Sequence, residues 1–128
     1  MRTWRAGLLP LVVVAVPFAL ASCEVDGPDD AAVDGPDPER GQALFAANCA
    51  ACHGTVGQGT TTGPPLVHEI YEPGHHSDEA FQVAVARGSP AHHWDFGDMP
   101  PVGGLDRDDV ADITAYVREL QREAGIID

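Results

Sequence analysis

Two cysteines and a histidine, in the order Cys49-Ala50-Ala51-Cys52-His53, constrain this chain more than any other stretch. Two thiols with a two-residue spacer lie on one helical turn, so both sulfurs can form thioether bonds at one edge of a porphyrin. The imidazole of His53 follows directly and lies where it can bind the iron beneath the ring. The pattern therefore predicts covalent attachment of one haem c with its iron.

The cysteine pair has two other interpretations. A redox dithiol is expected before a helix in a βαβ context, and no such context surrounds Cys49 and Cys52. A structural zinc site needs a second pair of cysteine or histidine ligands. The other histidines of the chain leave zinc formally open, although neither alternative fits the spacing well.

Residues 1–22 are interpreted as a targeting segment and are excluded from the fold. Two arginines precede an apolar run over residues 6–20, and Leu20-Ala21-Ser22-Cys23 follows it. These four residues resemble a bacterial lipobox, which predicts that Cys23 is the lipidated first residue of the mature protein. The alternative is an uncleaved helical anchor, but the apolar run is at the short limit for spanning a bilayer and contains two prolines. Either interpretation places the domain on the extracytoplasmic face of a bacterial membrane, for example in the periplasm.

The remaining chain divides into a tether and a domain. Residues 23–36 contain five acids and two Gly-Pro pairs, which predicts a disordered, self-repelling tether behind the lipidated cysteine. Residues 37–128 form the predicted domain. A core of that size is marginal on its own, so we expect the covalent haem to supply much of its apolar mass.

The chain is strongly acidic. Its formal net charge is −13, and it contains no lysine. Such a surface repels nucleic acid and anionic lipid headgroups, so we expect no nucleic-acid partner. The charge either provides solubility alone or prepares the domain to dock on a partner with a basic face.

Three helices and two long loops are predicted, which indicates an all-α fold. The first helix begins after Asp37 as N-cap and runs into the cysteine pair. The second begins at Ser77 and ends at Gly88, and the third covers about 106–124. The loops over 54–76 and 89–105 are rich in glycine, proline and histidine and have no strand pattern. One face of the third helix is apolar, with Val110, Ile113, Val117 and Leu120.

An iron held by one histidine needs a sixth ligand or an open position, and methionine is the usual partner in electron carriers. Met1 leaves with the targeting segment, so Met99 is the candidate. Two prolines follow Met99 and stiffen the backbone that would hold its thioether at iron. The alternative is that Met99 only fills space in the core.

Taken in order, these motifs resemble those of a class I cytochrome c of the small bacterial, monohaem type, over about residues 37–124. A glycine-rich loop that ends in Gly63-Pro64-Pro65-Leu66 matches the family. The resemblance implies that the carbonyl of Pro64 accepts the Nδ1–H of His53 and that Met99-Pro100 supplies the sixth ligand. It also implies that the last helix crosses the first at Gly41.

The resemblance implies a fold of three main helices and long loops wrapped around one covalently bound haem. For function it implies a single-electron carrier, with no catalytic acid or nucleophile to assign. The docking ring of lysines in mitochondrial members is missing here, so their partners do not carry over. We expect a redox donor and acceptor that are membrane-bound and present a basic face. The chain acts alone or as a subunit of a larger oxidoreductase.

Aromatic and histidine side chains add further candidates. His92 and His93 precede Met99 closely, so either one could bond a haem propionate or displace Met99. We expect Trp94 and Phe96 to pack against the ring, with the Trp94 N–H as a propionate donor. Paired histidines can bind copper or zinc, but more often they are solvated loop residues. Besides His53 the chain contains five histidines, His68, His75, His76, His92 and His93.

Two alternative functions follow from these residues. A labile sixth ligand would suit a haem protein that senses a gas or peroxide, or acts on it as an enzyme. The histidine pairs would suit a copper-handling lipoprotein, although the haem motif argues against that as the main function.

Overall fold

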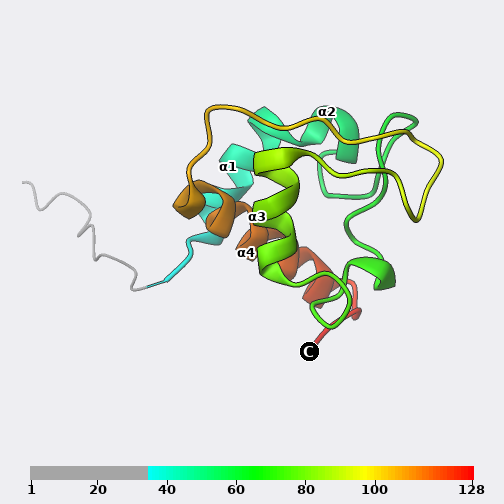
Figure 1. Ribbon diagram of the computed structural model, residues 1–128. Coiled ribbons are helices and arrows are strands. Elements are labelled where there is room, and N and C mark those ends of the chain that lie inside the picture. The colour runs from blue at the N-terminus through cyan, green and yellow to red at the C-terminus, as the bar shows by residue number, and fades with distance from the viewer. Residues whose placement is uncertain (1–34) are drawn as a thin grey trace, which may run out of the picture. The chain divides into compact units, whose positions relative to one another are not determined.

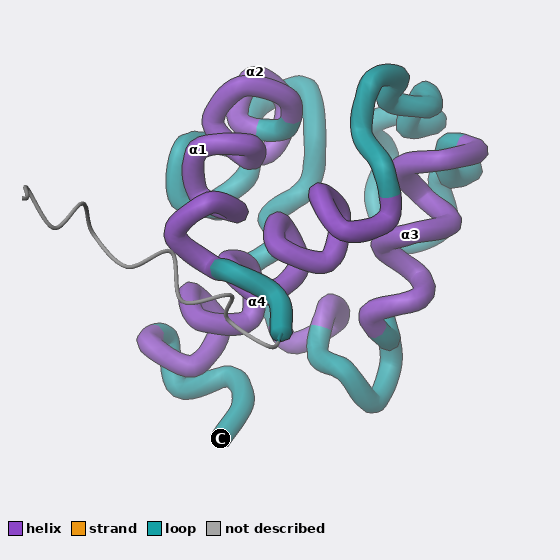
Figure 2. The backbone as a smooth tube through the Cα atoms, turned by 90° about the vertical axis from the view of Figure 1, so that its left-hand side faces the viewer, coloured by secondary structure: helices purple, strands orange, loops and turns teal. Residues whose placement is uncertain are grey.

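The computed structural model describes residues 35–128, which form an all-α fold (Figures 1 and 2). The targeting segment, the lipobox with Cys23 and most of the tether lie outside the described residues. No helix within 35–128 combines the length and the apolar character needed to cross a bilayer. The helices are α1 (Pro38–Asn48), α2 (Ala50–His53), α3 (Asp78–Arg87) and α4 (Arg107–Glu123), with a 3-10 turn η1 (Glu69–Tyr71).

Helix α1 begins where the sequence predicts. The side chain of Asp37 accepts hydrogen bonds from the backbone N–H groups of Glu39 and Arg40, at 2.9 and 3.1 Å. The chain continues from α1 into the attachment motif, as predicted, with one interruption that the sequence does not indicate. At Cys49 the backbone departs from helical geometry, with φ −119° and ψ −34°, and the short α2 begins at the next residue.

Helix α3 has the predicted bounds, but its first turn lacks a side-chain capping hydrogen bond. Ser77 occupies the N-cap position, yet its side chain makes no capping hydrogen bond. The first turn contains the acids Asp78 and Glu79, which interact favourably with the positive end of the helix. It ends before Gly88, which adopts φ +77° and donates its N–H to the carbonyl of Ala84.

Helix α4 provides much of the core. A reciprocal capping box between Asp106 and Asp109 fixes its first turn. Its predicted apolar face is buried at Val110, Ile113 and Val117, whereas Leu120 is only partly buried. The aromatic ring of Tyr116 completes the buried cluster.

Helices α1 and α4 cross at a glycine, as the family resemblance implies. A Cβ atom at Gly41 would collide with the backbone carbonyl of Asp112 and would lie 3.0 Å from the nitrogen of Ile113. This close approach lets Phe45 of α1 pack edge-on against Tyr116 of α4, with ring centroids 5.5 Å apart. The crossing thus brings the buried side chains of α1 and α4 together in the hydrophobic core.

The two long loops cover the rest of the molecule. Figure 1 shows the segment after α3 extending away from the helices and returning over them to the start of α4. This returning loop is held by one isolated antiparallel bridge between Ser89 and Met99 and by a hydrogen bond of 2.9 Å from Val102 to the carbonyl of Val85. Its backbone is therefore fixed against α3 next to Met99.

Candidate functional site

A largely apolar cavity of about 640 Å³ lies between the helices and the two long loops. Its size is within the range of sites that enclose a cofactor. All three predicted helices contribute to its wall, and both loops do as well. Among its lining residues are Phe45, Cys49, Cys52, His53, Pro64, Leu66, Phe81, Val85, Trp94, Met99 and Ile113.

Both cysteines of the motif lie at this cavity. Cys52 is exposed, whereas Cys49 is half-buried, and burial raises the pKa of the Cys49 thiol to about 11. A redox dithiol needs the opposite, a lowered thiol pKa. No cluster of three potential metal ligands within the described residues includes either cysteine, which also disfavours a zinc site. Thioether attachment is the chemistry that this arrangement favours.

His53 is buried to 9% exposure, and its ring is oriented by the glycine-rich loop. Its Nδ1 lies 2.9 Å from the carbonyl oxygen of Pro64, the contact that the family resemblance implies. A carbonyl can only accept, so Nδ1 carries the hydrogen and Nε2 keeps a free lone pair for a metal. The loop approaches so closely that a Cβ at Gly63 would lie 2.8 Å from the carbonyl oxygen of Cys52.

Met99 lines the same cavity from the returning loop. Its backbone N–H and carbonyl both pair with Ser89, at 2.9 and 3.0 Å. A Cβ at Gly88 would lie 3.2 Å from the ring of Pro101, so the start and the end of this loop are in contact. The side chain of Met99 is thus carried on a backbone that hydrogen bonds to Ser89 hold in place.

Trp94 supplies a test of whether the cavity fits a haem. Its Nε1 is the one side-chain nitrogen or oxygen in 35–128 that is buried without a hydrogen-bond partner. Burial raises the pKa of the Tyr71 hydroxyl, and the nearby indole N–H opposes that rise, but the two groups do not reach hydrogen-bond geometry. Buried N–H groups in proteins are normally hydrogen-bonded to an acceptor, and a haem propionate would provide one here. The residues present therefore fit the group.

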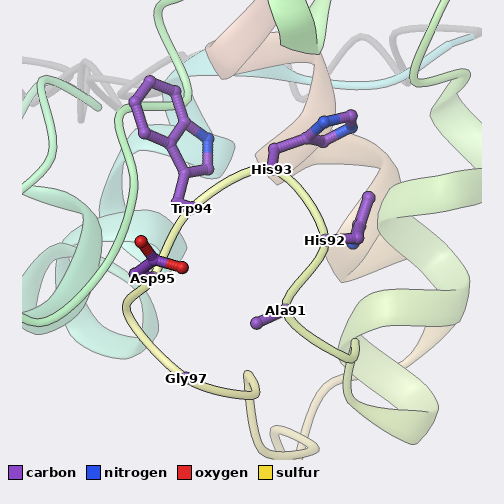
Figure 3. A pocket seen from close by; sticks show the side chains of 6 residues that line it. All are labelled: Ala91, His92, His93, Trp94, Asp95 and Gly97. Atoms are coloured by element: carbon purple, nitrogen blue, oxygen red, sulfur yellow. The ribbon is translucent and has the colours of Figure 1, made fainter.

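The histidines outside the motif divide into two sets. His68 packs edge-on against Trp94, with centroids 5.1 Å apart. The other four lie together, with neighbouring ring centroids 4.2 to 5.7 Å apart. Figure 3 shows the rings of His92 and His93 projecting outward from the same stretch of the returning loop. Burial and the three neighbouring imidazoles lower the pKa of His93.

Sequence reasoning missed a buried polar pair on α4. Arg118 donates to the carbonyls of Tyr71 and His76, at 2.6 Å each, and to Asp78. Gln121 is fully buried and donates to the carbonyl of Leu66 at 2.9 Å and to that of Tyr71 at 3.0 Å. These two side chains fasten the first long loop to α4. The sequence signal that could have identified them is their spacing: they are three residues apart, on the same side of α4 as its apolar face.

Comparison with known proteins agrees with this geometry. The chain is 30% identical over 93 residues to a cbb3-type cytochrome c oxidase subunit, CcoP, of Azospirillum sp. (strain B510). That alignment covers 66% of this chain and 31% of the relative, so less than a third of the relative is matched. The family model described as cytochrome c matches residues 38–121, which include the motif, the cavity wall and Met99. This chain therefore belongs to the cytochrome c family, and it carries the covalent haem c for which Cys49-Ala50-Ala51-Cys52-His53 is the attachment motif.

Proposed function

We propose that this protein is a monohaem, single-electron carrier of the class I type. In this proposal the haem is bonded to Cys49 and Cys52, and its iron is held between His53 and Met99. The observation that carries it is that all four side chains line one apolar cavity. The haem iron supplies a one-electron couple, and no substrate is transformed.

The chain's own residues favour electron transfer over ligand exchange. The carbonyl of Pro64 holds the ring of His53 in one orientation, and the pairing with Ser89 holds the backbone of Met99. Both ligands can therefore keep their positions in either oxidation state, so little has to reorganise. Apolar side chains such as Phe45 and Ile113 exclude water from the cavity between them.

Electron exchange is proposed to occur at the edge of the cavity next to Cys52, because that cysteine is exposed while its neighbour Cys49 is half-buried. Residues 35–128 contain 15 acids and five arginines. Three of the arginines, Arg40, Arg107 and Arg118, are engaged in ion pairs with acids of the chain. This charge supports docking on donors and acceptors with a basic face, with attraction that weakens as salt increases.

A respiratory membrane is the proposed setting. The relative with 30% identity is a subunit of a cbb3-type oxidase, which supports a place beside or within a membrane-bound oxidoreductase. Lipidation of Cys23 would hold the domain on the extracytoplasmic face, with residues 24–36 as its tether. Mass spectrometry of the mature protein should find an acylated N-terminal cysteine at position 23. A mature chain that retains residues 1–22 would instead support the uncleaved helical anchor.

Redox titration combined with carbon monoxide binding tests the carrier function. The purified protein should hold one haem per chain, titrate reversibly with one electron, and bind carbon monoxide slowly in the ferrous state. Rapid binding of carbon monoxide would overturn the proposal and favour the gas or peroxide sensor, whose sixth position is labile. Haem that is extracted by acid and acetone would contradict covalent attachment.

A further inference from the structure

Four imidazoles meet on the loops beside the haem cavity, and the carrier function does not use them. We infer that His75, His76 and His93, with His92 against them, form a second metal site, for one tetrahedral d10 ion, Zn²⁺ or Cu⁺. This site is separate from the haem iron and goes beyond the proposed electron transfer. Three features support this site: the spacing of the ring nitrogens, the positions of their hydrogen atoms and the backbone behind them.

The spacing of the nitrogens matches shared coordination. His75 Nε2 lies 3.1 Å from His93 Nε2, and His76 Nε2 lies 3.4 Å from His92 Nε2. Two nitrogens bound tetrahedrally at about 2.0–2.1 Å from one zinc ion would be about 3.3–3.4 Å apart. Ligand nitrogens of His75, His76 and His93 all lie within 4.8 Å of one another. Small ring rotations therefore bring three or four of them around one ion.

When both rings are neutral, the hydrogen atoms on their Nδ1 atoms leave no ordinary hydrogen bond between His76 and His92. His76 Nδ1 lies 2.6 Å from the carbonyl oxygen of Ile70, and His92 Nδ1 lies 2.7 Å from that of Pro90. Carbonyls only accept, so both Nδ1 atoms carry hydrogen and both neutral rings present a bare Nε2. Two bare nitrogens 3.4 Å apart repel each other unless a cation lies between them.

The same two carbonyls are the outer contacts that a metal-binding histidine requires. Zinc-bound imidazoles usually donate their second N–H to a carbonyl or carboxylate, which fixes the ring and makes its other nitrogen a better ligand. The backbone behind the cluster is also braced. Arg118 donates to the carbonyl of His76, and the N–H groups of His75 and His76 both bond to the carbonyl of Glu72, at 3.1 and 2.8 Å.

The site would join two segments that are distant in sequence. His75 and His76 belong to the loop before α3, whereas His92 and His93 belong to the returning loop that carries Met99. A bound ion would clip these loops together beside the haem cavity, which His76, His92 and His93 also line. The acidic surface favours the approach of a cation. Imidazole ligands and tetrahedral geometry together select zinc or monovalent copper over magnesium or calcium.

Calorimetric titration of the purified, haem-loaded protein with Zn²⁺ tests this site, with Cu⁺ measured in parallel by competition against a colorimetric chelator. We expect one equivalent of at least one of these ions to bind. His75→Gln and His93→Gln should each weaken binding by at least about tenfold, and the double variant should abolish it. The visible haem spectrum reports in each case that the variant is folded.

His68→Asn is the matched control. It also removes one imidazole, but His68 lies outside the cluster and caps η1 through its contact with the N–H of Ile70, a role that asparagine can keep. This variant should bind the ion as the unsubstituted protein does. Hydrogen exchange of backbone amides in 89–99 should slow when the ion is bound.

Two results would overturn the inference. One is the absence of binding by both ions to a protein with an intact haem spectrum. The other is binding that persists undiminished in the double variant, which would show that His75 and His93 are not ligands of the ion. Either result leaves the electron-carrier proposal intact, because that proposal is tested by the redox titration and carbon monoxide binding.

Discussion

Substitution of Gly41 by alanine tests the helix crossing on which the domain is built. On an exposed helix this change would stabilise by about 1 kcal/mol, because alanine has the higher helix propensity. Here the added Cβ collides with the backbone carbonyl of Asp112, which cannot rotate away as a side chain would. Helices α1 and α4 must separate, which loosens the contact of Phe45 with Tyr116. Overpacking of this kind costs about 1–3 kcal/mol before packing losses, so we expect a net destabilisation of about 2 kcal/mol.

Thermal unfolding followed by circular dichroism provides the measurement. For a domain of this size, 2 kcal/mol lowers Tm by roughly 10 °C. Gly103→Ala is the matched control, because nothing lies within 4 Å of a Cβ there and its φ is not in the left-handed region. The control should leave Tm unchanged or raise it slightly. A Gly41→Ala protein at least as stable as the unsubstituted one would refute the reasoning.

Three further substitutions address other parts of the account. Arg118→Leu removes charge-assisted bonds to two carbonyls and should lower the free energy of unfolding by about 3 kcal/mol in chemical denaturation. The backbone amides of the first long loop should also exchange hydrogen faster. A loss below about 1 kcal/mol would contradict the role of Arg118 in fastening that loop. The pKa of Glu79 is lowered by the hydrogen bond and charge of Arg107, so its stabilisation is present at neutral pH and fades as pH falls through that lowered pKa. Glu79→Gln should therefore slightly reduce the fall of Tm between neutral and acid pH, and an unchanged pH profile would rule out the contribution. Trp94→Phe should shift the reduction potential with little loss of stability if the indole N–H bonds a propionate, and an unchanged potential would exclude that bond.

Much of the helical frame could be predicted, because its signals are local. Asp37 with Pro38 identifies the start of α1, and the capping acids with the apolar face identify α4. The attachment motif defines the cofactor by residue type and spacing alone. The close approach of α1 and α4 at Gly41 was implied by the family resemblance. It depends on how two helices pack together, so residues near Gly41 in the sequence do not indicate it.

The rest depended on contacts between distant segments. Nothing local to Cys49 indicates that the helix breaks there, and Ser77 looks like a side-chain cap although it makes no such bond. Arg118 is buried because the folded chain brings the carbonyls of Tyr71 and His76 against it. The meeting of His75 with His93 likewise depends on how two loops without regular structure pass each other.

The near-infrared absorption of the ferric protein reports whether the iron is held between His53 and Met99. A thioether bound to ferric iron gives a weak sulfur-to-iron charge-transfer band, so the account predicts this band in the native protein. Met99→Ala should abolish it, lower the reduction potential and admit carbon monoxide to the ferrous haem. Met99→His should also abolish the band and lower the potential while keeping the iron six-coordinate. A native protein without the band, or one whose band survives in Met99→Ala, would contradict the account.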